Sequence, residues 1–256
     1  MRILRRKPSI SEWPTAYRAD RASSRKQCPI DNDGMKSIPS ILDRIGITPL
    51  VRLNRVAAGL RLPVLGKCEF LNPGGSVKDR IALAIVDDAE RRSLLNPGMT
   101  LVEATAGNTG IGLALVAAVR GYRVACVLPA KMSADKRAAL TALGAEVIVV
   151  PNAPPTSLDN FQNVARKLAQ ERGWFLTDQF ANPANPRIHE LTTGPEVLAQ
   201  TDGRVGAFVC GIGTGGTITG VGRFLLPREM KALSSLSLHV FLRARTGGWT
   251  QGRRAP

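Results

Sequence analysis

Three short blocks, in chain order, hold the residues of this 256-residue chain that are best suited to chemistry. They are 73–80 (Pro-Gly-Gly-Ser-Val-Lys-Asp-Arg), 105–110 (Thr-Ala-Gly-Asn-Thr-Gly) and 213–217 (Gly-Thr-Gly-Gly-Thr). Each block is typical of a strand end that passes into a helix. The first offers the amine of Lys78 at a helix start, the second offers the amide of Asn108 on a tight loop, and the third offers a nest of backbone N–H groups.

The first and third blocks together predict a site for pyridoxal 5′-phosphate. This cofactor forms a Schiff base with a lysine amine, and its phosphate needs a cradle of donors. A lysine that reacts in this way must be buried or lie near positive potential, and a helix start supplies the potential. The competing role for Lys78 is a solvated lysine beside Asp79. The cradle residues, whose glycines let the backbone approach an anion, are Gly213, Thr214, Gly215, Gly216 and Thr217.

The third block has a second interpretation, because 211–216 is close to the dinucleotide-binding pattern G-x-G-x-x-G. That pattern requires an acidic residue about twenty positions further on, at the end of a second strand. The corresponding stretch, 231–236, contains none. The phosphate of a pyridoxal cofactor is therefore the better assignment.

Three further runs match a known family: 47–53 (Ile-Thr-Pro-Leu-Val-Arg-Leu), 67–72 (Lys-Cys-Glu-Phe-Leu-Asn) and 179–183 (Gln-Phe-Ala-Asn-Pro). With the blocks, they make the stretch from about Ser40 to Leu225 resemble the cysteine synthase and cystathionine β-synthase family of pyridoxal-phosphate enzymes. The resemblance implies the α/β architecture of fold-type II enzymes, with two doubly wound α/β domains, of which the second is incomplete here.

The resemblance also implies a role for each residue of the blocks. Lys78 would be the Schiff-base lysine and, once released, the base that removes the substrate's α-proton. Asn108 would donate to the cofactor's ring hydroxyl. The family residue that faces the pyridine nitrogen, usually a serine, has no match in this sequence. The substrate carboxylate would be held by Gln179 and by the loop residues Thr105, Ala106, Gly107 and Thr109, and the family commonly has serine in place of the alanine.

These roles imply β-replacement on a small amino acid. Serine or O-acetylserine would lose its β-substituent, and a thiol or sulfide would replace it. The runs 182–186 and 192–196 favour cysteine synthase, which forms cysteine, and we prefer this reading. The runs 131–133 and 67–80 favour cystathionine β-synthase, which joins serine and homocysteine. Threonine dehydratase is a more distant alternative, and a complete chain would be a homodimer.

Composition argues against other partners. The net charge of +15 would suggest nucleic acid, but 1–36 and 226–256 carry +5 each, so two thirds of the excess lies at the ends. No apolar run is long enough to cross a membrane. We expect no metal site and a surface-exposed or internally bonded His189. A cytoplasmic location fits the four cysteines without a C-x-x-C pair, which are Cys28, Cys68, Cys126 and Cys210.

Apolar and helical patterns alternate along the chain and predict a parallel, doubly wound sheet with ligands at the carboxyl ends of its strands. Three glycines follow helices at positions where positive φ is favoured, namely Gly121, Gly144 and Gly173. Buried strands are predicted at 50–53, 63–70, 101–104, 124–128, 147–150 and 207–210. Helices are predicted at 77–92, 109–120, 134–143, 160–172, 190–200 and 216–225.

We expect the chain to have three parts. Full-length family members continue with further β/α units, so a truncated, non-catalytic remnant is an alternative of a different class. Ser234, Ser235 and Ser237 lie in unmatched sequence and receive no role. The first part is an extension at 1–36, which is disordered or precedes a start at Met35. The second is a catalytic region at 37–225, with a smaller domain at about 79–182 and a partial second domain at 40–78 plus 183–225. The third is an unmatched tail at 226–256.

Overall fold

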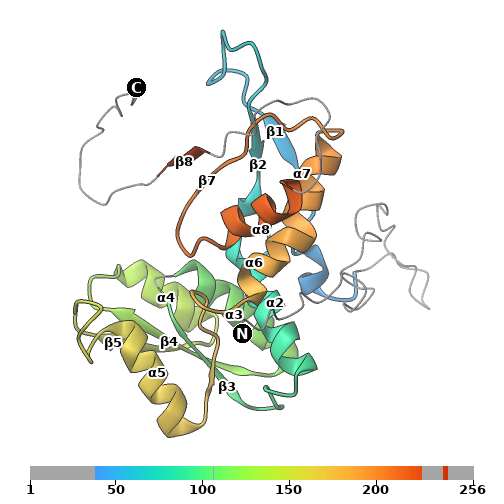
Figure 1. Cartoon of the computed structure of the whole chain (residues 1–256). Coiled ribbons are helices and arrows are strands. Elements are labelled where there is room, and N and C mark those ends of the chain that lie inside the picture. The colour runs from blue at the N-terminus through green and yellow to red at the C-terminus, as the bar shows by residue number, and fades with distance from the viewer. Residues whose placement is uncertain (1–37, 106, 227–238, 242–256) are drawn as a thin grey trace, which may run out of the picture.

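A computed structural model of the chain describes residues 38–105, 107–226 and 239–241, and these residues form two lobes (Figure 1). The lower lobe in that view is built on a four-stranded sheet in the order β5-β4-β3-β6. All three strand pairings are parallel, as the alternating sequence pattern predicts. The strands are β3 (Thr100–Ala104), β4 (Arg123–Pro129), β5 (Glu146–Val150) and β6 (Phe175–Leu176).

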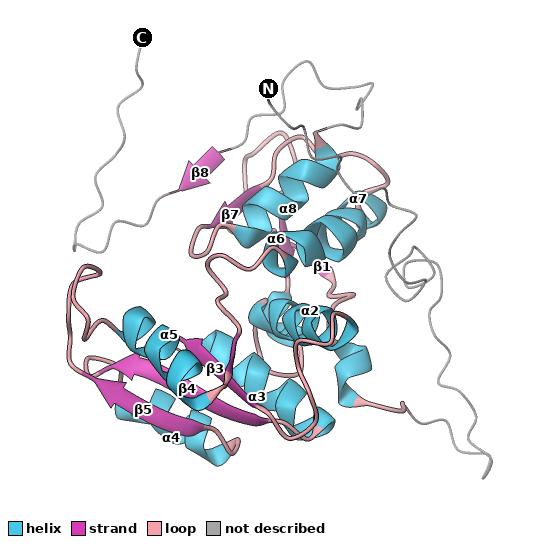
Figure 2. Cartoon of the chain, turned by 60° about the horizontal axis from the view of Figure 1, so that its bottom comes forward, coloured by secondary structure: helices cyan, strands magenta, loops and turns pink. Residues whose placement is uncertain are grey.

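Helices cover both faces of this sheet, and Figure 2 shows α5 and α4 on opposite sides of it. Alternate residues of β4 point to opposite faces: Val124 and Cys126 pack with α2, α3 and α4, whereas Ala125 and Val127 pack with α5. This alternation gives the lobe two hydrophobic cores. The helices are α2 (Lys78–Arg91), α3 (Asn108–Arg120), α4 (Ala134–Ala142) and α5 (Phe161–Arg172).

The upper lobe contains a helical layer and two short strand pairs. The helical layer begins with α6 (Ala184–Ile188), continues through a π-helical segment (His189–Thr193) and ends with α7 (Gly194–Gln200). It packs with α8 (Gly216–Leu225). The remaining elements of this lobe are β1 (Leu50–Arg52), β2 (Leu65–Lys67), β7 (Val209–Gly211), β8 (His239–Phe241) and the 3₁₀ helix Glu69–Leu71. A second 3₁₀ helix, Ile41–Arg44, packs its Leu42 into the core of the lower lobe.

The glycines predicted to follow helices are confirmed. Gly121, Gly144 and Gly173 have φ values of 77°, 83° and 63°, the left-handed region that a residue with a Cβ avoids. They end α3, α4 and α5 close to the predicted positions. No helix among the described residues is long and apolar enough to span a bilayer.

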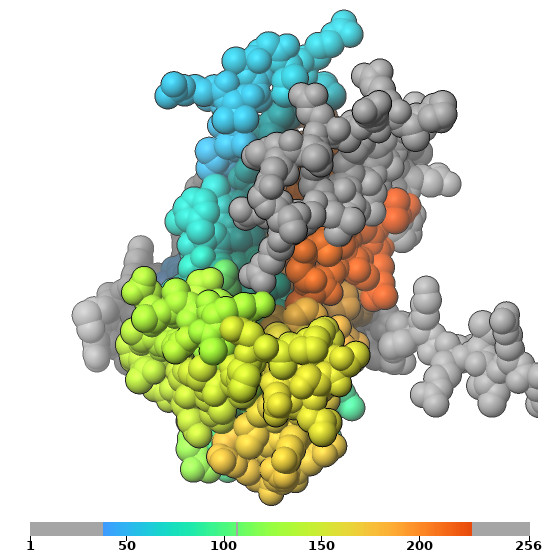
Figure 3. All heavy atoms as spheres, turned by 90° about the vertical axis from the view of Figure 1, so that its left-hand side faces the viewer, coloured from blue at the N-terminus to red at the C-terminus, as the bar shows by residue number. Residues whose placement is uncertain are grey.

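The expectation of buried strands at 50–53 and 63–70 is wrong. β1 and β2 form an antiparallel pair, and Val51 and Leu65 are 49% and 39% exposed. Figure 3 shows this region, in blue and cyan, projecting away from the green and yellow lobe. Short apolar runs look alike in sequence whether or not a helix covers them, so periodicity could not reveal the difference. The strand predicted at 207–210 is observed as β7 at Val209–Gly211, and its Val209 is 54% exposed in place of being buried.

Three further differences concern short or irregular elements. The predicted helix at 190–200 begins at Ala184 instead, because Pro183 caps the helix and Pro186 lies in its first turn, where proline is tolerated. β6 has only two residues and gave no sequence signal. No strand was predicted in the unmatched tail, but β8 lies in it and pairs in parallel with β7. Other predictions fall outside the described residues, namely those for 1–36, Met35, Cys28, Ser234, Ser235 and Ser237.

Candidate active site

Lys78 is the first residue of α2, and the loop before it is folded around the neighbouring aspartate. The Ser76 hydroxyl oxygen accepts from the Lys78 backbone N–H at 3.1 Å, which fixes the helix start. Asp79 is fully buried, and its carboxylate accepts from the Gly74 N–H at 2.5 Å. A Cβ on Gly74 would lie 2.6 Å from that carboxylate, so this close turn requires glycine. Asp79 is therefore committed to the loop backbone.

Burial lowers the pKa of the Lys78 amine from its usual value. This is the direction that a nucleophile or base needs, because only the neutral amine can attack a carbonyl or accept a proton. The solvated lysine considered above would keep its ordinary surroundings. α3 packs closely on the start of α2, since a Cβ on Gly112 would lie 3.1 Å from the Lys78 carbonyl oxygen.

The second block follows β3 and joins a residue from a distant part of the chain. Thr105 is buried, and its hydroxyl oxygen accepts from the Gly107 N–H at 3.2 Å. The Thr109 hydroxyl donates to the side-chain oxygen of Gln179 at 2.6 Å. Asn108 is the exposed first residue of α3. The structure thus brings the predicted carboxylate-binding residues together, apart from Ala106, which lies outside the described residues.

The third block forms an open turn at the start of α8. Gly215 has a φ of +79° and caps the helix, and no atom lies within 4 Å of where a Cβ would be on Gly213 or Gly215. Among the described residues, no protein group accepts from the N–H groups of Gly213, Thr214 and Gly215. Free N–H groups at a helix start favour an anion. These residues therefore fit a phosphate group.

Asn185, on α6, links the second and third blocks and had no individual sequence signal. Its side-chain nitrogen donates to the Gln179 carbonyl oxygen at 2.8 Å and to the Thr214 hydroxyl oxygen at 2.9 Å. Its side-chain oxygen is buried without a partner among the described residues. A continuous chain of hydrogen bonds therefore runs from Thr109 through Gln179 and Asn185 to Thr214.

His189 contacts the same loop. Its Nδ1 lies 2.9 Å from the Thr193 hydroxyl and its Nε2 lies 3.2 Å from the Thr217 hydroxyl, so the expectation of an internally bonded histidine is confirmed. Burial, helped by the positive charge of Arg80, lowers the pKa of the imidazole to about 3. The positive charge of Lys78 makes a smaller contribution in the same direction.

A buried ion network holds the start of α2 against the upper lobe. Arg80 is 2% exposed and makes two hydrogen bonds to each of two carboxylates, at 2.7 and 2.8 Å to Glu69 and at the same distances to Glu196. Lys67 pairs with Glu196 at 2.6 Å. Burial alone would raise the pKa of Glu69, but the hydrogen bonds and charge of Arg80, with smaller contributions from Thr48 and others, lower it to about 2.

The glycine at 216 is expected to be essential for the shape of this site. A Cβ there would lie 1.9 Å from the Asn185 side-chain oxygen, so Gly216→Ala should force the loop and α6 apart. We expect a loss of about 1–3 kcal/mol in unfolding free energy, together with weaker binding of pyridoxal phosphate in a fluorescence titration. The matched control is Gly222→Ala on the same helix, where a Cβ meets nothing within 4 Å. Equal behaviour of the two variants would contradict the prediction.

The fold is α/β, and hydrogen bonds connect the loop after β3 with the glycine-containing turn at the start of α8. Residues 41–235 match the family described as pyridoxal-phosphate dependent enzyme. Because the match covers most of the chain, the chain belongs to this family, whose cofactor is pyridoxal 5′-phosphate.

Curated relatives and solved structures carry the same similarity. Cystathionine β-synthase of Oryctolagus cuniculus is 50% identical over 194 residues, which are 74% of this chain and 35% of the relative. Cysteine synthase of Staphylococcus aureus (strain Mu50) is 48% identical over 191 residues, 74% of this chain and 61% of the relative. The crystal structure of O-ureido-L-serine synthase has a TM-score of 0.72 at 46% identity, covering 80% of this chain and 62% of that one. The chain thus spans between about a third and three fifths of these proteins.

Proposed function

We propose that the protein catalyses β-replacement on serine or O-acetylserine, with sulfide as the incoming nucleophile and cysteine as the product. The observation that carries this proposal is the hydrogen-bonded chain from Thr109 through Gln179 and Asn185 to Thr214. It holds a loop suited to a substrate carboxylate beside a loop suited to the cofactor's phosphate. Both anions of such a reaction are then accommodated next to a lysine whose pKa is lowered.

Each block has one task in this proposal. Bound pyridoxal phosphate supplies an electron-withdrawing ring that makes the substrate's α-proton acidic. Lys78 Nζ accepts that proton, because burial favours its neutral form. The N–H groups at 213–217 hold the phosphate at the start of α8, and Asn108 lies at the start of α3 to orient the ring. The loop from Thr105 to Thr109 binds the substrate carboxylate.

A second candidate is cystathionine β-synthase activity, which would use serine and homocysteine. The observation in its favour is the 50% identity to the rabbit enzyme of that name. The similarity to O-ureido-L-serine synthase shows that related proteins carry names for different β-substituted products. The two candidates share the amino-acid substrate and differ in the nucleophile, which an assay with both nucleophiles distinguishes.

The organisation of the whole protein is proposed on the same basis. We assign the smaller domain to about 79–182 and the second domain to 40–78 plus 183–225. The position of the four-stranded sheet within the first range supports this assignment. The thiols of Cys68, Cys126 and Cys210 are free, which supports a reducing, cytoplasmic location. We also propose that the protein forms a homodimer and that it binds small-molecule substrates and no nucleic acid.

Turnover with two substrate pairs tests the proposed reaction. With cofactor added, we expect kcat/KM for O-acetylserine plus sulfide to exceed that for serine plus homocysteine by at least about tenfold. Homocysteine is larger than sulfide, and a site suited to the smaller nucleophile discriminates against the larger one by about this factor. Cysteine and cystathionine would be quantified by mass spectrometry. Faster cystathionine formation would reverse the order of the two candidates. Deamination of threonine without any thiol would contradict both.

A further inference from the structure

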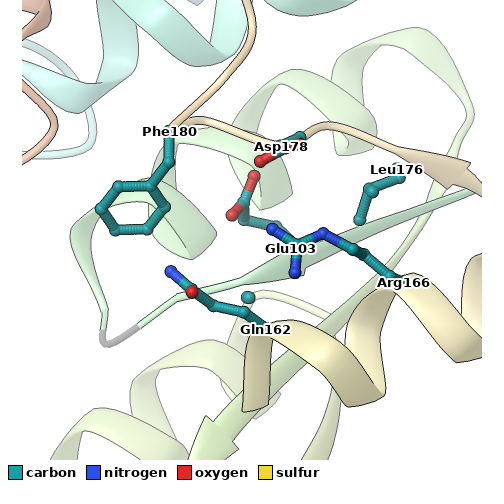
Figure 4. A pocket seen from close by; sticks show the side chains of 7 residues that line it. Glu103, Gln162, Arg166, Leu176, Asp178 and Phe180 are labelled. Atoms are coloured by element: carbon teal, nitrogen blue, oxygen red, sulfur yellow. The ribbon is translucent and has the colours of Figure 1, made fainter. Parts of the chain in front are cut away.

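Glu103 is a buried carboxylate to which the sequence assigned no role. It lies in β3, two residues before Thr105, and it is only 1% exposed. Figure 4 shows its side chain between the loop that carries Asp178 and helix α5, which carries Arg166. A carboxylate in such a place must be satisfied by hydrogen bonds from its neighbours. The identity of those donors connects Glu103 with the predicted substrate site.

Three donors surround the Glu103 carboxylate, and two of them belong to the same glutamine. One oxygen accepts from the Thr177 hydroxyl at 2.5 Å and from the Gln179 backbone N–H at 3.0 Å. The other oxygen accepts from the side-chain nitrogen of Gln179 at 3.3 Å. Glu103 therefore holds both the backbone and the amide group of the residue that was predicted to bind the substrate carboxylate.

The hydrogen atoms of the Gln179 amide are fully used inside the protein. One is donated to Glu103, and the other is donated to the Ala104 carbonyl oxygen at 3.3 Å. The amide oxygen accepts the only hydroxyl hydrogen of Thr109, at 2.6 Å. In this arrangement neither side chain has a hydrogen left for a bound carboxylate. A substrate can reach the Gln179 amide only if that amide first leaves Glu103.

We propose that Glu103 is a positioning residue that competes with the substrate carboxylate for the amide of Gln179. The inference rests on the proposed function, in which Gln179 takes part in binding that carboxylate. In the substrate-free protein the amide is held on Glu103. When the substrate enters, its carboxylate replaces Glu103 as the acceptor, and Glu103 keeps its bonds to Thr177 and to the Gln179 backbone.

The charge of Glu103 sets the strength of this competition. Burial, aided by the negative charge of Asp178, raises the pKa of the Glu103 carboxyl to about 7, although hydrogen bonds from Thr177 and Gln179 oppose the shift. On β4, burial and Glu103 together raise the pKa of the Cys126 thiol to about 12, so that neighbour is uncharged. A small cavity of about 10 Å³ beside Glu103 is also lined by Arg166 and Asp178. The Arg166 guanidinium donates to the side-chain oxygen of Asn163. As pH rises through 7, Glu103 becomes ionised and holds the amide more strongly.

The first experiment compares substrate binding in three cofactor-loaded versions of the 256-residue chain: wild type, Glu103→Gln and the control Glu146→Gln, which removes an exposed carboxylate from β5 of the same sheet. L-Serine dissociation constants are measured by absorbance titration at pH 6 and pH 8. We compare the ratio of the wild-type dissociation constant to that of the variant, because the titration of serine itself cancels in this ratio. For Glu103→Gln the ratio should rise from about one at pH 6 to about ten at pH 8, the margin of a charge-assisted over a neutral hydrogen bond.

For Glu146→Gln the ratio should stay near one at both pH values. A Glu103→Gln protein that binds serine more weakly than wild type at pH 8, or whose ratio does not change with pH, overturns the proposal. Weaker binding would mean that Glu103 supports the substrate site in place of competing with it.

A second readout needs neither serine nor a folded variant at position 103. The side-chain amide resonance of Gln179 in wild-type protein, assigned with Gln179→Ala, should shift as pH crosses 7 in the absence of substrate. A resonance that is constant with pH would overturn the proposal. If no protein binds serine, the proposed function fails, and this amide titration still decides whether Glu103 holds Gln179.

Discussion

Replacing Lys78 with alanine is expected to lower kcat/KM for β-replacement by at least about 1000-fold, because the variant loses both its amine for the cofactor and its base for the α-proton. The unfolding free energy should change by less than about 1 kcal/mol, since Lys78 is only partly buried and makes no ion pair among the described residues. The measurement is steady-state kinetics with O-acetylserine and sulfide, beside thermal unfolding of each protein.

Lys167→Ala is the matched control, because Lys167 is exposed on α5 and pairs only at 3.8 Å with Glu171. It should leave activity unchanged. Borohydride reduction of the cofactor-loaded wild type, followed by peptide mass spectrometry, should place the pyridoxyl group on Lys78. A label on another lysine, or a Lys78→Ala protein that retains turnover, would remove Lys78 from its proposed role.

Replacing Arg80 with methionine is expected to cost about 3–5 kcal/mol of unfolding free energy, the usual penalty for leaving buried charges unpaired. The substitution removes the shared partner of Glu69 and Glu196 while keeping an apolar side chain of similar length. Urea unfolding of the full chain gives the value. Arg92→Met is the control, because Arg92 ends the same helix in an exposed pair with Asp88 and should cost less than about 1 kcal/mol.

The pH dependence of the Arg80→Met effect follows from the direction of the Glu69 shift. In the wild type the pKa of Glu69 lies at about 2, below its usual value, so its contribution to stability is present above about pH 4.5 and is lost as pH falls toward 2. In the variant, Glu69 stays buried without Arg80, and this burial raises its pKa. Acid then protonates the Glu69 carboxylate and removes the unpaired charge. The difference in unfolding free energy between the wild type and the variant should therefore become smaller as pH falls from 4.5 to 2. A gap that widens in acid would contradict this account.

The central sheet and its helices could be predicted because their signals are local. β3, β4 and β5 are mostly apolar and rich in β-branched residues, and α8 agrees with the predicted range of 216–225. Glycine after a helix reports a backbone angle that few other residues adopt, so Gly121 and Gly173 marked two helix ends within the sequence itself.

The upper lobe was predicted less well because its features depend on what covers a segment. β1 and β2 pair antiparallel across a connection of residues 53–64, and an apolar run does not show whether a helix lies over it. The start of the helical layer, residues 184–189, was also missed, since two Asn-Pro pairs suggest a loop. Tertiary contacts of α6 with α2 and α8 outweigh that local preference.

The same distinction applies to the candidate site. Lys78 and the two glycine-containing loops are contiguous motifs, so residue type and order were enough to propose them. Asn185, Glu103 and Arg80 act on partners far away in sequence: Asn185 meets Thr214 across 29 positions, and Arg80 meets a carboxylate across 116. A single sequence gives no distance between such positions. Their roles could be found only from the folded chain.

The single amide group of Asn185 also has a thermodynamic consequence. Its two hydrogens are donated to the Gln179 carbonyl oxygen and to the Thr214 hydroxyl oxygen, and the Gln179 side chain in turn accepts from Thr109 of the 105–109 loop. Displacing either the 105–109 loop or the 213–217 turn therefore disturbs a chain of hydrogen bonds that also orders the other. Affinities linked in this way are reciprocal, because the free energy of filling both sites does not depend on the order of filling. Whatever factor a phosphate at 213–217 adds to the affinity for a carboxylate at 105–109, the carboxylate returns to the phosphate.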